Sequence, residues 1–159
     1  MSLNTIGLQT DKSKAIATKL NTLLANFQVY YQNLRGIHWN IMGKRFFDLH
    51  VKFEELYNDA NLKVDAIAER VLTLGETPLH TFDDYINEAK VPVGKNVSQD
   101  ENAVRLIVDS LTELLNIERS ILEASSNASD EGTNSMMSDF ITEQEKTVWM
   151  MKAWLNEKV

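Results

Sequence analysis

The sequence predicts an all-α protein, in which four long helices pack as one bundle and a short helix lies in the crossover between the second and the third. Apolar residues recur every three or four positions along four long stretches, as they do on the buried face of a helix. Both prolines, Pro78 and Pro92, fall in one connection between these stretches. At 159 residues we expect a single domain over residues 1–159, of which residues 1–10 form a short N-terminal tail.

Composition and charge narrow the class of protein. No apolar run approaches the length that spans a bilayer, and the start of the chain lacks the basic and apolar segments of a signal peptide. The chain has no cysteine, hence no disulfide and no thiolate metal site, so we expect a cytoplasmic protein. The net charge of −7 argues against a general nucleic-acid binder and fits a protein that attracts cations.

The first helix is predicted over residues 12–38, with Asp11 as its N-cap. His38 ends this helix, where a cationic side chain is favoured by the helix dipole. Trp39 follows, and large aromatic residues of this kind are common at contacts between subunits. Residues 40–45 form a turn, in which a glycine at position 43 permits a positive φ.

The second helix is predicted over residues 46–74, a stretch without Gly or Pro, and Gly75 ends it. Residues 75–97 form a long crossover with a short helix near 81–89. A connection of this length allows the second and third long helices to run parallel. The third helix begins at a capping box over residues 98–101, and the fourth covers residues 130–156.

Four side chains with metal-binding chemistry share one face of the second helix. At about 100° per residue, His50, Glu54, Asp65 and Glu69 fall within a stripe roughly 100° wide. They form two pairs at i,i+4 spacing, each close enough to share one cation. The pairs themselves are about 16 Å apart along the axis, from Glu54 to Asp65, whereas metal–oxygen bonds measure about 2.0–2.6 Å. One helix therefore cannot bring both pairs to one metal.

Two arrangements satisfy this constraint. Either the pairs belong to separate sites, or a second copy of the helix runs antiparallel beside the first, and a two-fold axis places each pair opposite the other pair of its partner. The combination of imidazole and carboxylate ligands suits iron more than calcium or magnesium.

The residues of this region resemble the signature of the mini-ferritins, the starved-cell DNA-binding protein (Dps) family, and the likeness covers nearly the whole chain. The matching positions are His38, Trp39, Gly43, Phe46, Leu49, His50, Glu54, Asp65, Glu69 and Arg70, continued by residues 72–75, 77–78 and 149–154.

The resemblance implies a ferritin-like four-helix subunit, twelve copies of which form a hollow shell with iron sites between two-fold-related subunits. By position, His38, His50 and Glu54 come from one subunit, and Asp65 and Glu69 from its partner. The family more often has Asp at the position of Glu54, which is one methylene longer and can still reach a metal. A Glu-x-x-His motif, which a site inside one bundle would need, is absent here.

Two accessory roles follow for neighbours of the ligands. The resemblance implies that Trp39 is a ring beside the iron site that intercepts oxidising equivalents. Arg70 is expected to form a salt bridge that orients the adjacent Glu69.

The activity implied is that of an iron-storing ferroxidase, which oxidises Fe²⁺ with hydrogen peroxide and keeps Fe³⁺ as a mineral in the shell, so that peroxide is consumed without free hydroxyl radical. The acidic start of the fourth helix complements the helix dipole. The family also implies a three-fold pore lined by carboxylates, for which Asp130, Asp139 and Glu143 are the candidates, since rings of like charge concentrate cations.

Two other functions remain open. The alternative within the family is a DNA-binding, nucleoid-compacting protein with little catalysis. Many relatives bind DNA through several basic residues in the tail, but this tail has no lysine before Lys12, and each lost cationic contact weakens phosphate binding. The third candidate is a structural assembly in which the acidic pairs only form salt links between subunits.

Overall fold

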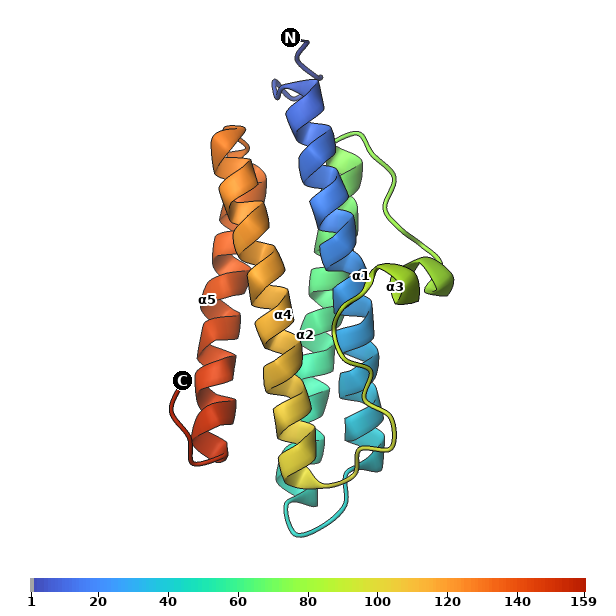
Figure 1. Cartoon of the computed structure of the whole chain (residues 1–159), viewed down its shortest axis with the longest axis vertical. Helices are drawn as coiled ribbons and strands as arrows, with labels where there is room; N and C mark the ends of the chain where they lie inside the picture. The colour runs from blue at the N-terminus through green and yellow to red at the C-terminus, as the bar shows by residue number, and fades with distance from the viewer. Residues whose placement is uncertain (1) are drawn as a thin grey trace.

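The computed structural model describes residues 2–159, and it confirms the all-α fold (Figure 1). The helices are α1 (Thr10–Asn40), α2 (Phe46–Thr73), α3 (Phe82–Glu88), α4 (Asp100–Asn127) and α5 (Glu131–Trp154). The four long helices lie side by side, with α1 against α2 and α4 against α5. As predicted from the length of the crossover, α2 and α4 run in the same direction, and α3 lies on the outside of the bundle against α1.

Several local predictions are confirmed. Gly43 in the first turn has φ +112°, and Gly75 after α2 has φ +92°, both in the region that favours glycine. The short α3 begins after Thr81, whose hydroxyl oxygen accepts the backbone N–H of Asp84.

Two predicted caps are wrong. The N-cap of α1 is Gln9 rather than Asp11, because residues 2–9 fold back on the helix. In that loop Asn4 Oδ1 accepts the backbone N–H of Leu8 at 2.9 Å. The N-cap of α4 is Gln99, without a side-chain hydrogen bond, so the capping box expected to begin at Ser98 does not form.

The crossover is held to α1 by three asparagines. The side chains of Asn21 and Asn33 each donate to and accept from its backbone. Asn26 is fully buried, accepts two backbone N–H groups of the crossover with Oδ1, and donates to the backbone oxygen of Thr22 in α1. The backbone groups they meet belong to Thr77, Leu79, Lys90, Val91, Pro92 and Gly94. Amide side chains with both a donor and an acceptor thus satisfy backbone groups in the irregular parts of the crossover on either side of α3.

The core contains one buried carboxyl group. Glu118 of α4 is 0% exposed, and Gln144 of α5 donates from Nε2 to its Oε2 at 2.5 Å. Among residues 2–159, Glu118 Oε1 and Gln144 Oε1 have no hydrogen-bond partner. Burial raises the pKa of Glu118 to about 8, against the opposing effects of Gln144, Lys63 and Arg119. The group is therefore mostly neutral at pH 7, and a proton on Oε1 removes the cost of an unpaired buried charge.

The free energy of unfolding should depend on pH through Glu118. Its pKa in the folded chain lies above the ordinary value of 4.5 that a glutamate has in an unfolded chain, so between these values the native state holds a proton that the unfolded state has released. The contribution of Glu118 to the free energy of unfolding therefore decreases progressively as the pH rises from about 4.5 to about 8. Glutamine does not titrate, so the free energy of unfolding of the Glu118→Gln variant should not show this decrease. The difference in unfolding free energy between the variant and the wild type should therefore shift in favour of the variant by a few kcal/mol between pH 4.5 and pH 8, on the order of 1.4 kcal/mol per pKa unit.

Urea unfolding followed by circular dichroism at pH 5, 6.5 and 8, at one protein concentration, measures this difference. The exposed Glu123 of α4 provides the control variant Glu123→Gln, which should track the wild type at each pH. A stability difference for Glu118→Gln that stays constant across the three pH values would contradict the prediction.

Candidate metal centre

Two histidines join the end of α1 to the start of α2 through a reciprocal pair of hydrogen bonds. The backbone oxygen of His50 lies 2.6 Å from His38 Nδ1, and the backbone oxygen of His38 lies 2.8 Å from His50 Nδ1. The two imidazole rings are stacked, with centroids 3.8 Å apart and planes at 12°. Residues twelve positions apart in sequence are therefore fixed against each other at the closed end of the α1–α2 hairpin.

These contacts determine which nitrogen can bind a metal. A carbonyl oxygen only accepts hydrogen bonds, so Nδ1 of each ring must carry the proton. In the neutral rings the lone pair then lies on Nε2, which among the described residues 2–159 has no protein partner on either His38 or His50. A hydrogen bond from the second ring nitrogen to a backbone carbonyl is a usual way in which proteins orient histidine ligands.

Aromatic rings hold the histidines in place. Phe46 stacks on His50, with centroids 4.8 Å apart, and Tyr57 packs edge-on against His38 at 5.3 Å. The Tyr57 hydroxyl donates to Glu54 Oε1 at 3.3 Å. Desolvation and the nearby Glu54 carboxylate raise the pKa of Tyr57, so the phenol remains a donor at neutral pH.

Tyr57 is not among the residues that the sequence predicts for the site. The only signal in the sequence is its position one turn after Glu54, which alone does not distinguish it from any other helical tyrosine.

The second predicted pair lies in the C-terminal half of α2. Asp65 and Glu69 are exposed on α2, and within residues 2–159 their carboxylates form neither an ion pair nor a hydrogen bond. No three His, Asp or Glu side chains gather around one point in the part of the chain that the structure describes. The predicted residues therefore lie in two separate places in each chain. The stacked His38 and His50 are linked to Glu54 through Tyr57, and Asp65 and Glu69 lie further along α2.

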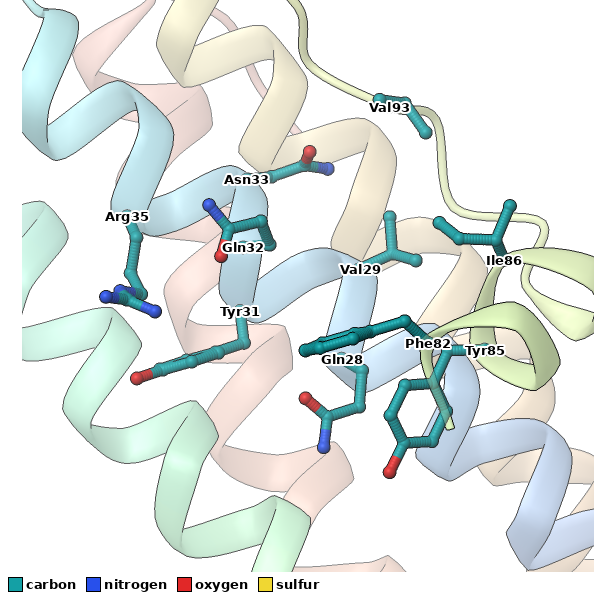
Figure 2. A pocket seen from close by; sticks show the side chains of 10 residues that line it. All are labelled: Gln28, Val29, Tyr31, Gln32, Asn33, Arg35, Phe82, Tyr85, Ile86 and Val93. Atoms are coloured by element: carbon teal, nitrogen blue, oxygen red, sulfur yellow. The ribbon is translucent and has the colours of Figure 1, made fainter. Parts of the chain in front are cut away.

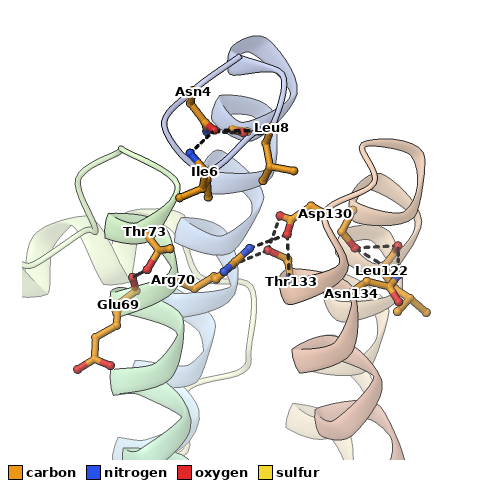
Figure 3. Close-up of polar contacts among 12 residues, drawn as sticks. Asn4, Ile6, Leu8, Glu69, Arg70, Thr73, Leu122, Asp130, Thr133 and Asn134 are labelled. Atoms are coloured by element: carbon orange, nitrogen blue, oxygen red, sulfur yellow. Dashed lines mark hydrogen bonds and ion pairs between the residues drawn. The ribbon is translucent and has the colours of Figure 1, made fainter.

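Arg70 does not make the contact expected of it. Its guanidinium donates from Nε to Thr133 Oγ1 at 2.9 Å and from Nη2 to Asp130 Oδ1 at 2.6 Å (Figure 3). In the same view, the side chain of Glu69 extends away from Arg70. The salt bridge predicted to orient Glu69 is thus replaced by one that ties α2 to the start of α5, because consecutive helical residues point in different directions.

The three pore candidates lie in different environments. Asp130 is 1% exposed, caps α5 by accepting the backbone N–H of Thr133, and pairs with Arg70, so its carboxylate cannot line an open channel. That prediction is corrected, since burial beside a guanidinium fixes Asp130 in a structural role. Glu143 is exposed and pairs with Lys63 at 2.7 Å, while Asp139 is exposed.

Trp39 lies on the surface beside the histidine pair. Its side chain is 56% exposed, and the guanidinium of Arg35 lies 4.8 Å from the centre of its ring.

Residues 2–159 contain no helix that is both long and apolar enough to cross a membrane.

Comparisons with known proteins agree with this geometry. Residues 17–158 match the family model of the ferritin-like domain. The chain is 39% identical over 152 residues to a DNA protection during starvation protein of Porphyromonas gingivalis, with 96% of each chain covered.

Solved structures are similar as well. A Dps protein of Vibrio cholerae O1, described as a member of a broad superfamily of ferritin-like diiron-carboxylate proteins, superposes with a TM-score of 0.95 at 49% identity and covers 98% of both chains. A Dps protein of Bacillus brevis gives a TM-score of 0.89 at 34% identity, over 93% of this chain and 99% of the other.

Replacing Asp130 should destabilise the subunit. Asp130→Ala removes the cap of α5 and leaves the Arg70 guanidinium, whose side chain is only 20% exposed, without its anion. We expect a loss of about 3 kcal/mol in the free energy of unfolding. Asp139→Ala, an exposed change on the same helix, should cost less than about 0.5 kcal/mol. Denaturant unfolding of both variants measures this, and equal losses would show that the Asp130 contacts contribute little.

Proposed function

The chain belongs to the Dps family of the ferritin-like superfamily, and from this premise we propose that it is an iron-storing ferroxidase whose sites form between two subunits. In this proposal His38, His50 and Glu54 of one subunit and Asp65 and Glu69 of a second bind Fe²⁺. Hydrogen peroxide oxidises the bound iron, and Fe³⁺ is stored as a mineral inside a hollow shell of twelve copies.

The symmetry of α2 is the observation that carries this proposal. The midpoint between His50 and Glu69 and the midpoint between Glu54 and Asp65 coincide, between residues 59 and 60. A two-fold axis at that point, perpendicular to the helix, sets a second α2 antiparallel to the first. His50 of each copy then lies level with Glu69 of the other copy, and Glu54 of each copy lies level with Asp65 of the other. The axis therefore generates two equal sites.

Apolar residues on the same face of α2 support a contact between copies. Phe47, Val51, Leu62 and Leu72 are between 52% and 81% exposed in the single chain. At 100° per residue they lie in the same stripe as the acidic ligands. An exposed apolar stripe interrupted by unpaired carboxylates is costly on an isolated subunit, and a second copy would cover it.

A groove between α1 and α3 is a second exposed apolar surface of the chain. It encloses about 280 Å³ and includes Tyr31, Phe82, Tyr85, Ile86 and Val93 in its lining (Figure 2). The side chains of Phe82 and Ile86 project from α3 over the groove and are largely exposed. Tyr31 of this lining packs edge-on against Tyr57, whose ring in turn packs against His38.

The donor set fits iron as the substrate. Two Nε2 lone pairs and three carboxylates offer nitrogen and oxygen ligands without thiolates, and solvent or peroxide can occupy the remaining positions. The reaction balances as two Fe²⁺, one hydrogen peroxide and two protons giving two Fe³⁺ and two waters. The contribution of the protein is to hold Fe²⁺ in open coordination, so that peroxide is reduced fully at the site.

Supporting residues complete the proposal. Trp39, exposed beside His38, is positioned to give an electron to an oxidant that escapes the site. With Asp130 excluded, Asp139 and Glu143 of α5 remain the candidates for an acidic entry route, although the carboxylate of Glu143 is already paired with Lys63.

The alternatives have less support. DNA binding through the tail is not favoured, because residues 2–9 carry no Lys or Arg and fold back against α1, and the net charge is −7. A purely structural assembly, in which the acidic pairs only form salt links to a second subunit, would leave without a function the Nε2 atoms of His38 and His50, which make no hydrogen bond within residues 2–159.

Removing a proposed ligand should slow oxidation without preventing assembly. His50→Ala and Glu69→Ala should each reduce the rate of peroxide-dependent Fe²⁺ oxidation by at least about tenfold, because losing even a residue that only supports a ligand typically costs that much. Stopped-flow absorbance of Fe³⁺ measures the rate, and sedimentation velocity reports the assembly. Glu55→Ala, an exposed change next to Glu54, is the matched control and should keep the wild-type rate. Unchanged rates in both ligand variants would refute the site.

Mixed assemblies distinguish a shared site from two separate ones. When His50→Ala and Glu69→Ala subunits are unfolded together and reassembled at equal ratio, each mixed pair has one site with both changes and one with neither. Random pairing should therefore restore about a quarter of the wild-type activity, far above either variant alone. If each subunit contained its own site, mixing would give only the average of the two inactive variants.

A further inference from the structure

Tyr57 connects two of the proposed ligands within one chain. Its hydroxyl donates to Glu54 Oε1 at 3.3 Å, and its ring lies edge-on to His38, with centroids 5.3 Å apart and planes at 77°. Glu54 Oε2 has no hydrogen-bond partner within residues 2–159 and stays available to a cation. One carboxylate oxygen of this exposed residue thus accepts from the phenol, while the other makes no hydrogen bond within residues 2–159.

The ring of Tyr57 is itself fixed by its surroundings. Tyr31 of α1 packs against it edge-on, with centroids 6.0 Å apart and planes at 78°. The guanidinium of Arg35 in turn lies 5.4 Å from the centre of the Tyr31 ring. Edge-to-face contacts of this kind favour one ring orientation, so the phenolic oxygen occupies a defined position relative to His38.

The contact with Tyr57 matters because the side chain of Glu54 is longer than that of an aspartate. A glutamate has one more rotatable bond than an aspartate, and ordering that bond costs conformational entropy when a metal binds. A donor that already holds the carboxylate lowers this cost. An aspartate at position 54 would end about 1.5 Å short, one carbon–carbon bond, and would not reach the same hydroxyl.

We propose that Tyr57 is a positioning residue of the metal centre, whose phenol holds the Glu54 carboxylate in the orientation that binds the metal, so that Glu54 and Tyr57 function as a matched pair. This inference rests on the proposed function, since it assigns Glu54 to the site, and it goes further by naming the residue through which the longer carboxylate is ordered.

Co²⁺ binding tests the pair without redox chemistry. Tyr57→Phe removes only the hydroxyl and retains the ring against His38, so the dissociation constant for Co²⁺ should rise about three- to tenfold, the net value of one typical hydrogen bond. The visible absorption of bound Co²⁺, which depends on its coordination, should change with it. Tyr31→Phe is the matched control, because the Tyr31 hydroxyl makes no contact with a proposed ligand, and its affinity should stay within about twofold of the wild type.

A double-mutant cycle separates positioning from general destabilisation. In a Glu54→Asp background the shorter carboxylate cannot reach the phenol, so adding Tyr57→Phe should change the Co²⁺ dissociation constant less than about twofold. An equal loss in both backgrounds, or wild-type affinity and absorption in Tyr57→Phe, would overturn the inference.

The same measurements distinguish this inference from the proposed function. If the wild type binds no Co²⁺ that depends on His50, the site itself is refuted. If His50-dependent binding is present but indifferent to Tyr57, only the positioning role is refuted. In peroxide-driven oxidation, the half-saturating Fe²⁺ concentration of Tyr57→Phe should rise by the same factor as the Co²⁺ dissociation constant, while the unfolding midpoint stays at the wild-type value.

Discussion

The fixed rise of an α-helix is the constraint on which the interpretation of this protein depends. Because α2 runs unbroken from Phe46 to Thr73, His50 and Glu54 cannot approach Asp65 and Glu69 within one chain. The separation is a consequence of backbone geometry and not of side-chain conformation, so no rearrangement of rotamers removes it. Chemistry that needs all four groups must therefore be a property of the contact between chains, and a folded subunit alone would have the ligands without the site.

The histidine pair links folding to ligand chemistry. The hydrogen bonds that close the α1–α2 hairpin are the same ones that place the protons on Nδ1 and leave Nε2 of His38 and His50 free. The tautomer is thus set as the turn forms, before any metal arrives. The aromatic rings of Phe46 and Tyr57 then restrict the imidazoles further, which reduces the entropy that binding must remove.

Helical periodicity and the placement of Gly and Pro predicted the helices and the parallel α2 and α4 to within a few residues, because both signals are local in sequence. The contacts that were missed depend on tertiary partners. The Arg70–Asp130 pair joins residues sixty positions apart, and a capping aspartate looks the same in sequence whether it faces solvent or a guanidinium. The contacts of Tyr57 and of the asparagines on α1 could not be predicted from the sequence either, because the role of an amide or phenol group depends on the groups that the fold brings next to it. The assignment of the ligands themselves still rests on their spacing, their free donor atoms and the family.

The asparagines that hold the crossover also determine where this connection tolerates change. Asn21, Asn26 and Asn33 bind only a few peptide groups, near residues 77–79 and 90–94, whereas the segment around α3 contacts α1 through side chains, among them the Thr22 hydroxyl that donates to Glu88. The outer surface of that segment can therefore change in evolution without disturbing the backbone contacts that hold the crossover. Residues 77–79 and 90–94, in contrast, should vary together with the asparagines of α1 that form hydrogen bonds with their backbone.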